Sequence, residues 1–207
     1  MPKSPSAPRV AAIVGPFMSG KTTLLESLLF ASGALPRKGS VKEGNTVGDF
    51  SPESRARQMS LDADVATMSY LDESWTFIAC PGSVEFLQEM EGALMVADAA
   101  VVVVEPDPNR AMMAAPILKF LDNHSIPHLI FVNKMDGAEA AKYLGATVEA
   151  LQSWSASPLV LRQCPIIEGD ALNGYVDLSF ERAFRYNPHQ ESTRIDVPAN
   201  LKDEVAA

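Results

Sequence analysis

The stretch VAAIVGPFMSGKTTLLESLLFASG, residues 10–33, decides the fold class of this chain. It begins with five apolar residues, which is typical of a strand buried on both faces of a sheet. It ends in a run whose four leucines, between residues 24 and 29, fall on one stripe of a helix. Between them lies GPFMSGKT, residues 15–22, which fits G-x-x-x-x-G-K-[ST]. A strand, a glycine-containing loop and a helix in this order predict a phosphate-binding loop.

The residue types of this loop explain the expected chemistry. Its glycines allow a tight backbone nest whose N–H groups point at phosphate oxygens, and the helix start adds the positive end of its dipole. Lys21 can reach the β- and γ-phosphates, and the Thr22 hydroxyl can bind Mg²⁺. Alternatively, Gly15 merely ends a strand and Gly20 merely opens a helix. The loop residues predicted to bind phosphate are Gly15, Pro16, Phe17, Met18, Ser19, Gly20, Lys21, Thr22 and Thr23.

A second motif, NKMD at residues 133–136, follows the apolar stretch 128–132. In α/β sheets, ligands bind outside the carboxyl ends of strands. Asp136 can accept hydrogen bonds from the N1–H and 2-amino groups of guanine, whereas adenine would leave a buried carboxylate unpaired. The Lys134 stem can lie over the base plane, and Asn133 can tie this loop to the phosphate loop. A surface turn is the alternative for this segment, but the two motifs together favour GTP over ATP.

Strand-like and helix-like segments alternate outward from these motifs. The strand-like segments cover residues 61–69, 75–79, 99–104 and 128–132, and the helix-like segments cover 84–96, 110–123 and 138–154. This order predicts an α/β fold with a doubly wound, mostly parallel sheet, in which the first two of these strands form an antiparallel hairpin. Within 61–69, the apolar Leu61, Ala63 and Val65 are expected to lie opposite Asp62 and Asp64.

Three other segments complete the expected organisation. Residues 1–9 are predicted to be a flexible arm and residues 10–156 the nucleotide-binding core. Residues 157–207 are expected to begin a smaller, incomplete α+β subdomain inserted into the fold. Its short strands are predicted at 159–161, 174–178 and 183–186, with a helix starting in 198–207. Pro116 is expected to kink the helix over 110–123.

Composition excludes several classes of protein. The 207 residues suffice for one sizeable core, and 47% of them are apolar. The net charge of −9 disfavours sequence-independent nucleic-acid binding, and no motif predicts sequence-specific binding. Cys80 and Cys164 have no metal-ligand spacing and form no disulfide framework. Without a signal sequence or an apolar run long enough for a membrane, a cytoplasmic protein is expected.

These motifs resemble the G domain of elongation factor G, and more strongly the elongation-factor-G-like paralogues of bacteria. The resemblance rests on residues 15–33, GSVKEGNTVGDFSPESRARQMS at 39–60, FIACPGSVEF at 77–86, NKMD, and GYVDL at 174–178 with the following Glu181, Arg182 and Ala183. It covers nearly the whole chain after the arm. It implies a P-loop NTPase G domain with GTP, GDP and Mg²⁺ as ligands. It also implies the ribosome as a partner of the full-length protein.

The resemblance implies two switch segments. Residues 33–60 correspond to the first, and Ser60 stands where the family usually has a threonine that contacts Mg²⁺. Pro81 and Gly82 belong to the second, where the glycine N–H senses the γ-phosphate. Such contacts order a loop with GTP bound and release it after hydrolysis. Thr22 and Ser60 are therefore the expected metal ligands, although a serine at a strand entry is the alternative for Ser60.

Three positions depart from the family pattern. Ala79 stands where the second switch usually begins with an aspartate that holds a water on Mg²⁺, and Ser83 replaces a histidine that positions the attacking water. Met18 replaces a frequent aspartate of the phosphate loop. Variation at Met18 and Ser83 is expected in the paralogues, whereas Ala79 is less expected. Because phosphoryl transfer depends on positioning and charge, we predict slow intrinsic hydrolysis and assign no catalytic residue.

Three functions remain open from the sequence. The first is a translational GTPase, which acts on the ribosome in its full-length form. The second is a nucleotide-sensing switch module with weak or no catalysis, which Ala79 and Ser83 favour. The third is an ATP-using P-loop kinase or ATPase, which leaves NKMD unexplained. Ser155-Ala156 resembles the last guanine-contacting motif of the family but precedes the insertion-like segment, so we predict that it is an ordinary loop.

Overall fold

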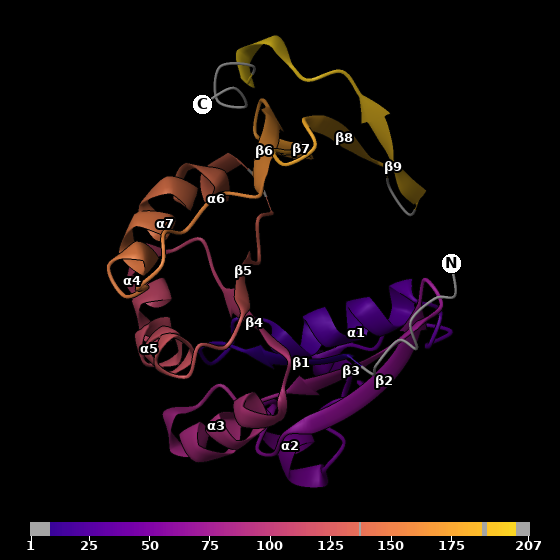
Figure 1. Ribbon diagram of the computed structural model, residues 1–207. Coiled ribbons are helices and arrows are strands. Elements are labelled where there is room, and N and C mark those ends of the chain that lie inside the picture. The colour runs from indigo at the N-terminus through magenta and orange to yellow at the C-terminus, as the bar shows by residue number, and fades with distance from the viewer. Residues whose placement is uncertain (1–8, 137, 188–189, 202–207) are drawn as a thin grey trace, which may run out of the picture.

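The computed structural model describes residues 9–136, 138–187 and 190–201, and these residues form two separate β-sheets (Figure 1). The first sheet has the strand order β2-β3-β1-β4-β5, and the second has the order β6-β7-β8-β9. Of the predicted arm, residues 1–8 lie outside the described residues. Arg9, its last residue, begins β1.

The first sheet is mostly parallel, as predicted. Its strands are β1 Arg9–Val14, β2 Asp64–Tyr70, β3 Glu73–Ala79, β4 Ala99–Val104 and β5 His128–Val132. Strand β1 pairs in parallel with β3 and β4, and β4 pairs in parallel with β5. Only β2 runs antiparallel, in the predicted hairpin with β3. After β3 the chain crosses β1 to reach β4, so a ligand-binding crevice is expected at the carboxyl end of β1.

Helices cover both faces of this sheet (Figure 1). The helical elements are α1 Lys21–Ala31, η1 Val41–Glu43, α2 Pro52–Arg57, η2 Val84–Phe86, α3 Leu87–Val96, α4 Pro108–Ala111, η3 Met112–Ala114, α5 Ala115–Asn123, α6 Ala138–Lys142 and α7 Leu144–Gln152. The predicted kink near Pro116 is a 3₁₀ turn, η3, and the proline itself stands in the first turn of α5. A proline is tolerated there because the first N–H groups of a helix have no partner within it.

Two apolar cores share the strand β1. Ala11 and Ile13 face the core under α1, where the predicted stripe of Leu24, Leu25, Leu28 and Leu29 packs. Ala12 and Val14 face the other core, where α3, α5 and α7 pack. Ile13, Val14 and Leu25 have no exposed surface. Full burial of an aliphatic side chain such as these stabilises the fold by about 1.5–3 kcal/mol.

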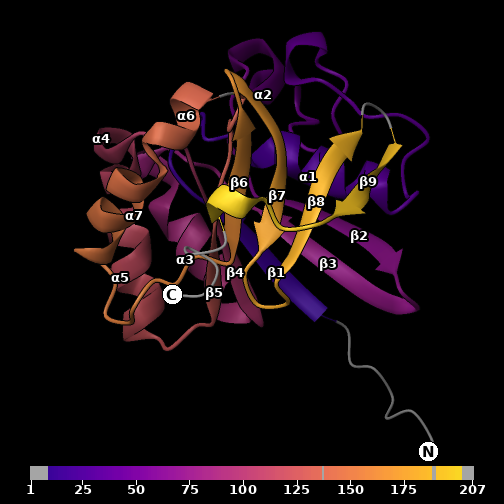
Figure 2. The ribbon, with the colours of Figure 1, turned by 90° about the horizontal axis from the view of Figure 1, so that it is seen from above.

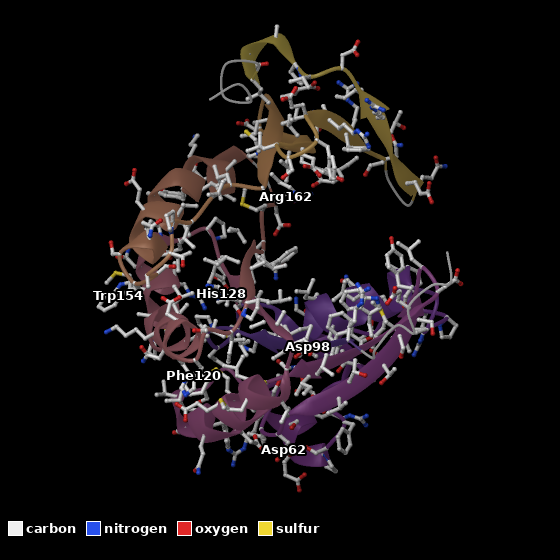
Figure 3. The ribbon with its side chains drawn as sticks, viewed as in Figure 1. Asp62, Asp98, Phe120, His128, Trp154 and Arg162 are labelled. Carbon is white, nitrogen blue, oxygen red and sulfur yellow. The ribbon has the colours of Figure 1, made fainter. Side chains whose placement is uncertain are left out.

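Aromatic side chains mark the outer side of the helical layer. Phe120 of α5 and Trp154, just after α7, lie on the same side of the molecule (Figure 3). The Lys119 ammonium lies 4.5 Å from the centre of the Trp154 ring, so a cation–π contact joins α5 to the end of α7. No helix among the described residues has the length and apolar character needed to cross a membrane.

The burial of β2 corrects the sequence-based alternation. Asp64, Ala66 and Met68 face inward, whereas the Val65 side chain is 65% exposed. The strand starts at Asp64, so the apolar residues before it do not continue its inward face. Pairing with β3 fixes the register instead, because residues directly opposite in the ladder lie on the same face.

The second sheet is an antiparallel meander that Figure 2 shows as four adjacent strands. Its strands are β6 Gln163–Glu168, β7 Ala171–Asp177, β8 Arg182–Asn187 and β9 Gln190–Ile195, and the 3₁₀ helix η4 Ala199–Leu201 follows. A small core around Ile166, Val176, Ala183 and Leu201 stabilises it. Arg162 lies at its junction with the preceding helices (Figure 3).

Two predictions for this region need correction. The segment predicted as a strand at 159–161 is a loop. In it, Leu159 packs against the core under α3, α5 and α7, and Val160 is 85% exposed. The strand begins four residues later, at Gln163. Strand β9 was missed because its sequence, QESTRI, has too few apolar residues to show a period. Residues 202–207 of the predicted final helix lie outside the described residues.

Candidate nucleotide-binding site

The predicted phosphate loop connects the carboxyl end of β1 to the start of α1. The Lys21 ammonium donates to the carbonyl oxygens of Gly15 and Pro16, both at 3.0 Å. The side chain is buried, and this desolvation lowers the pKa of Lys21 to about 8, with the nearby Asp49 carboxylate opposing it in part. Both hydrogen-bond partners of this buried cation are neutral carbonyls, so an anionic ligand would add favourable charge beside it.

Gly20 allows the base loop to reach the phosphate loop. Its φ is 98°, and a Cβ atom there would lie 2.2 Å from Nδ2 of Asn133. Because Gly20 has no Cβ atom, the Asn133 side chain fits beside it, and its Nδ2 donates to the Ser19 carbonyl at 2.9 Å. The predicted tie between the two motifs is therefore present in the structure, although the two residues are 114 positions apart.

Lys134 extends the connection between the loops. Its ammonium donates to the Met18 carbonyl at 2.8 Å and pairs with a carboxylate oxygen of Glu105 at 2.5 Å. Asp136 is exposed at the same strand end. All three predicted guanine-contacting residues line a cleft of about 900 Å³ that extends along β5 towards the second sheet.

Glu105 and Arg110 also belong to this part of the site, and the sequence analysis missed both. Glu105 pairs with Lys134 and with Arg110, each at 2.5 Å. Arg110 also donates to the Phe17 carbonyl at 3.3 Å. We call Glu105, Arg110, Asn133 and Lys134, with the carbonyls they hold, the base side of the site. Glu105 follows β4 directly, and this position at a parallel strand end was the available signal.

Thr22 and Ser60, the expected metal ligands, lie together. Their hydroxyl oxygens are 3.4 Å apart. Thr22 also donates to Oδ2 of Asp49 at 3.1 Å, and Asp49 is a further residue that the sequence analysis missed. Asp49 lies next to the buried Asp64, whose Oδ2 accepts the Asp49 N–H at 2.8 Å. We call Thr22, Asp49, Ser60 and Asp64 the switch side.

The first switch segment is anchored on α1 by a buried carboxylate. Glu26 is 1% exposed and accepts the Gly39 N–H at 2.9 Å. It also accepts the Val47 N–H. These two charge-assisted hydrogen bonds fix the segment on either side of η1. The long segment without sequence periodicity is therefore an ordered loop with two short helices, η1 and α2, in the described structure.

The second switch segment contacts the phosphate loop at Gly82. A Cβ atom at Gly82 would lie 2.3 Å from the Lys21 ammonium and 2.8 Å from the Phe17 nitrogen. Pro81 is buried, and Ser83 is half-buried at the start of η2. Ala79 ends β3 with its methyl group buried, so it presents no oxygen to the site. Cys80 is also buried, which raises the pKa of its thiol to about 12 and keeps it neutral.

The oxygen atoms around Thr22 fit a hard cation. Hydroxyl and carboxylate oxygens are the ligands that Mg²⁺ prefers, and Mg²⁺ usually takes only one or two carboxylates while waters and phosphates fill its other positions. Among the residues described, no group of three or more His, Cys, Asp or Glu side chains could hold a metal. The arrangement therefore suits a nucleotide-bound Mg²⁺ and not a metal held by protein ligands alone.

Ser155-Ala156 lies in a loop after α7, as predicted. The Ala156 N–H donates to the Asp122 carboxylate at 2.7 Å. This contact ties the loop to the end of α5. Ser155 and Ala156 also line the cleft that contains Asn133, Lys134 and Asp136, but neither makes a hydrogen bond to the base side.

Comparisons with known proteins agree with this geometry. The sequence model of the protein family described as elongation factor Tu GTP binding domain matches residues 7–189. An elongation factor G-like protein of Synechocystis is 50% identical over 193 residues, which are 93% of this chain and 29% of the relative. Elongation factor G 2 of Streptomyces coelicolor is 33% identical over 190 residues, which are 91% of this chain and 27% of the relative.

Two further similarities point the same way. The mitochondrial ribosome-releasing factor 2 of Bos taurus is 33% identical over 174 residues, 84% of this chain and 22% of the relative. A crystal structure of a Thermus thermophilus protein superimposes with a TM-score of 0.84 at 31% identity, covering 95% of this chain and 29% of that one. The chain thus spans less than a third of the length of these relatives. The match over residues 7–189 and the relatives confirm the resemblance drawn from the sequence, and the chain belongs to the family of the elongation factor Tu GTP binding domain.

Proposed function

We propose that this chain binds GTP and GDP with Mg²⁺ and is the nucleotide-binding part of a translation-factor GTPase. The observation that carries the proposal is the hydrogen bond from Asn133 to the Ser19 carbonyl, which joins the base loop to the phosphate loop. This bond supports the proposal, because it holds residues 133–136 next to the loop proposed to bind the phosphates. Lys21 supplies the cation for the β- and γ-phosphates.

The proposed assignment of residues follows the sequence motifs. Residues 15–23 with Pro81 and Gly82 contact the phosphates, and Asn133, Lys134 and Asp136 contact guanine. Thr22 and Ser60 serve the Mg²⁺ ion, because their hydroxyls lie side by side next to Lys21. Residues 10–156 form the nucleotide-binding core, and residues 157–207 belong to a subdomain inserted into it.

The proposed setting is the ribosome, in the cytoplasm, with GTP hydrolysis as the switch. The names of the relatives support this, since two are elongation factor G proteins or similar to them and one is a ribosome-releasing factor. Driving translocation and splitting ribosomes are two candidate roles of the full-length protein, whose relatives extend well beyond the matched residues.

A nucleotide-sensing module with weak catalysis is the second candidate. Ala79 and Ser83 favour it, because neither side chain can hold a Mg²⁺-bound water or direct an attacking water as a carboxylate or imidazole would. In this case the nucleotide-dependent ordering of the first switch segment, and not turnover, would be the function.

Equilibrium titration with fluorescent GTP, GDP and ATP analogues, with Mg²⁺ and with EDTA, tests the binding proposal. We expect guanine nucleotides to bind at least about 100-fold more tightly than ATP, because adenine leaves the Asp136 carboxylate without donors. Equal affinity for ATP would contradict the proposed role of the base loop. A circular dichroism melt of the same sample establishes that the chain is folded.

Single-turnover phosphate release separates the two candidates. We expect slow intrinsic hydrolysis, since the loss of water-positioning groups costs orders of magnitude in rate. A full-length elongation factor G serves as the reference. A rate equal to that of the reference would contradict this expectation and exclude the weakly catalytic module.

A further inference from the structure

The antiparallel pairing of β2 with β3 places Asp64 directly opposite Ala79. Side chains of directly opposed residues project from the same face of a sheet and lie close together. Both are buried here, with Asp64 8% and Ala79 5% exposed. A carboxylate from the neighbouring strand therefore stands beside the position where β3 lacks one.

The Asp64 carboxylate and the methyl group of the phosphate-loop Thr22 both lie close to Gly48. A Cβ atom placed on Gly48 would lie 3.1 Å from Oδ2 of Asp64 and 3.3 Å from the Thr22 methyl group, so both side chains flank the same point. The carboxylate also holds the first switch segment, since it accepts the Asp49 N–H. Asp64 therefore lies between the first switch segment and Thr22.

Asp49 supplies an independent sign of a cation. Its side chain is 6% exposed, and its Oδ2 accepts the Thr22 hydroxyl. Its other carboxylate oxygen, Oδ1, is buried and has no hydrogen-bond partner among the described residues. A buried carboxylate oxygen without a partner is costly, so its retention indicates a positive ligand.

Two carboxylates, Asp49 and Asp64, lie next to each other at this point, and the Lys21 ammonium lies near Asp49. Burial raises the pKa of the Asp64 carboxyl group, the hydrogen bond from the Asp49 N–H opposes this increase, and the negative charges of Asp49 and Asp62 add to it. The Lys21 ammonium is engaged by the carbonyls of Gly15 and Pro16. A divalent cation beside Thr22 would relieve the repulsion between the two carboxylates.

We propose that the Asp64 carboxylate, presented from β2, serves the Mg²⁺ of the bound nucleotide in the place of the carboxylate that Ala79 lacks on β3. Asp64 acts through a Mg²⁺-bound water or through the position of Asp49, and is therefore a positioning residue. The inference rests on the proposed binding of Mg²⁺ with a nucleotide. If Asp64 has this role, the absence of a carboxylate at Ala79 is no longer an argument for a catalytically weak module. The site then has a carboxylate on β2 in place of one on β3.

The test is the Mg²⁺ dependence of GDP affinity in the 207-residue chain, measured with a fluorescent GDP analogue in Mg²⁺ and in EDTA. The main variant is Asp64→Asn, which keeps an oxygen to accept the Asp49 N–H but removes the charge. The matched control is Asp72→Asn, in the exposed turn between β2 and β3. The rescue variant is Asp64→Asn with Ala79→Asp, which returns the carboxylate to β3.

We expect Asp64→Asn to reduce the Mg²⁺-dependent gain in affinity by about 10-fold to 100-fold, as for residues that support metal ligands. Its affinity in EDTA should change little, which shows that the fold is intact. Asp72→Asn should behave as the parent chain, and the rescue variant should recover most of the gain. A purely structural role for Asp64 would give no recovery with Ala79→Asp.

Two results would overturn the inference, and they differ in what else they exclude. If the parent chain gains affinity from Mg²⁺ and Asp64→Asn gains as much, the role of Asp64 is wrong while the proposed function stands. If the parent chain binds nucleotide equally in Mg²⁺ and EDTA, the proposed Mg²⁺ site is wrong as well.

Discussion

The base side and the switch side of the site are built from different interactions. On the base side, Asn133 and Lys134 hold carbonyl oxygens of the phosphate loop, and the ion pairs of Glu105 lie partly in solvent. On the switch side, two buried carboxylates crowd around Thr22, and one of their oxygens has no partner among the described residues. On the base side the charged groups pair with one another, whereas on the switch side two carboxylates lie together and a bound cation would reduce their repulsion.

This difference suggests a division of labour. A preorganised base side can select guanine at little conformational cost. A switch side with two adjacent carboxylates responds to the presence of Mg²⁺ and phosphate, because those groups change its energy most. The two sides can be tested separately, starting with Lys21, where they meet.

Lys21→Met should have the largest effect on nucleotide affinity. The ammonium is expected to donate to the β- and γ-phosphates, and each hydrogen bond to a charged group contributes about 1.5–3 kcal/mol. Two such bonds give a loss of roughly 3–6 kcal/mol, or roughly 100-fold to 10,000-fold in affinity. Calorimetric titration with GDP in Mg²⁺ checks this, and unchanged affinity would exclude Lys21 from the phosphate site.

The same lysine makes the stability of the ligand-free chain depend on pH. Its pKa falls from 10.5 to about 8 on folding, so between these values the unfolded chain binds more protons than the folded chain. Stability from this group therefore rises as the pH increases from about 8 to 10.5. At about 1.4 kcal/mol for each pKa unit, the full increase is about 3 kcal/mol.

Urea unfolding at several values of pH, compared with Lys21→Met, isolates this contribution. The free energy of unfolding of the parent chain, minus that of the variant, should increase as the pH rises above about 8. A constant difference between the two proteins from about pH 7 to about pH 10 would show that Lys21 is not buried in the ligand-free state.

Gly82→Ala should displace the phosphate loop at Phe17 and Lys21, where the base side and the switch side meet. The added methyl group would lie 2.3 Å from the Lys21 ammonium and 2.8 Å from the Phe17 nitrogen, so the phosphate loop must shift. Overpacking of this kind costs about 1–3 kcal/mol, and we expect a similar loss of GTP affinity.

Gly92→Ala is the matched control for this substitution. A Cβ atom there meets nothing within 4 Å, and Gly92 lies inside α3. Alanine should stabilise the helix by up to about 1 kcal/mol and leave nucleotide affinity unchanged. Comparable losses of affinity in both variants would show that Gly82 does not act through contact with Lys21.

Glu105→Gln should have the smallest effect and should be confined to the base side. The substitution removes the ion pairs with Lys134 and Arg110, which are partly exposed and are worth up to about 1 kcal/mol each. We expect the ratio of GTP to ATP affinity to fall by several-fold, measured by competition. Glu139→Gln, which breaks the exposed pair with Lys142, is the control and should leave the ratio unchanged.

The sequence predicted those parts of the site that depend on local backbone geometry. Residues 10–33 contain a buried strand, a glycine-containing loop and an amphipathic helix, and each has a period or a residue type that is specific to it. The connection between Asn133 and Ser19 was also predictable, because carboxyl ends of parallel strands meet at one edge. The mostly parallel sheet and the hairpin followed from the alternation of elements, whereas the order of the strands was not predicted.

The switch side was less predictable, since it depends on contacts between distant segments. Asp64 and Val65 were placed on the wrong faces, because alternation alone does not say where a strand begins. Glu26 occurs in an amphipathic helix and gives no local sign that it anchors a loop. Asp49 has a positive φ of 55° and a buried carboxylate, and both depend on how the whole segment folds against β2.

The shared strand β1 also determines how the molecule opens. Its residues hydrogen-bond to β3 on one side and β4 on the other, and they complete both cores of the first sheet. Amide hydrogens of Ile13 and Val14 can exchange with solvent only when both cores are lost, so they should be among the slowest to exchange. The second sheet has its own small core and can open by itself. The nucleotide loop is therefore attached to the last segment of the chain to unfold.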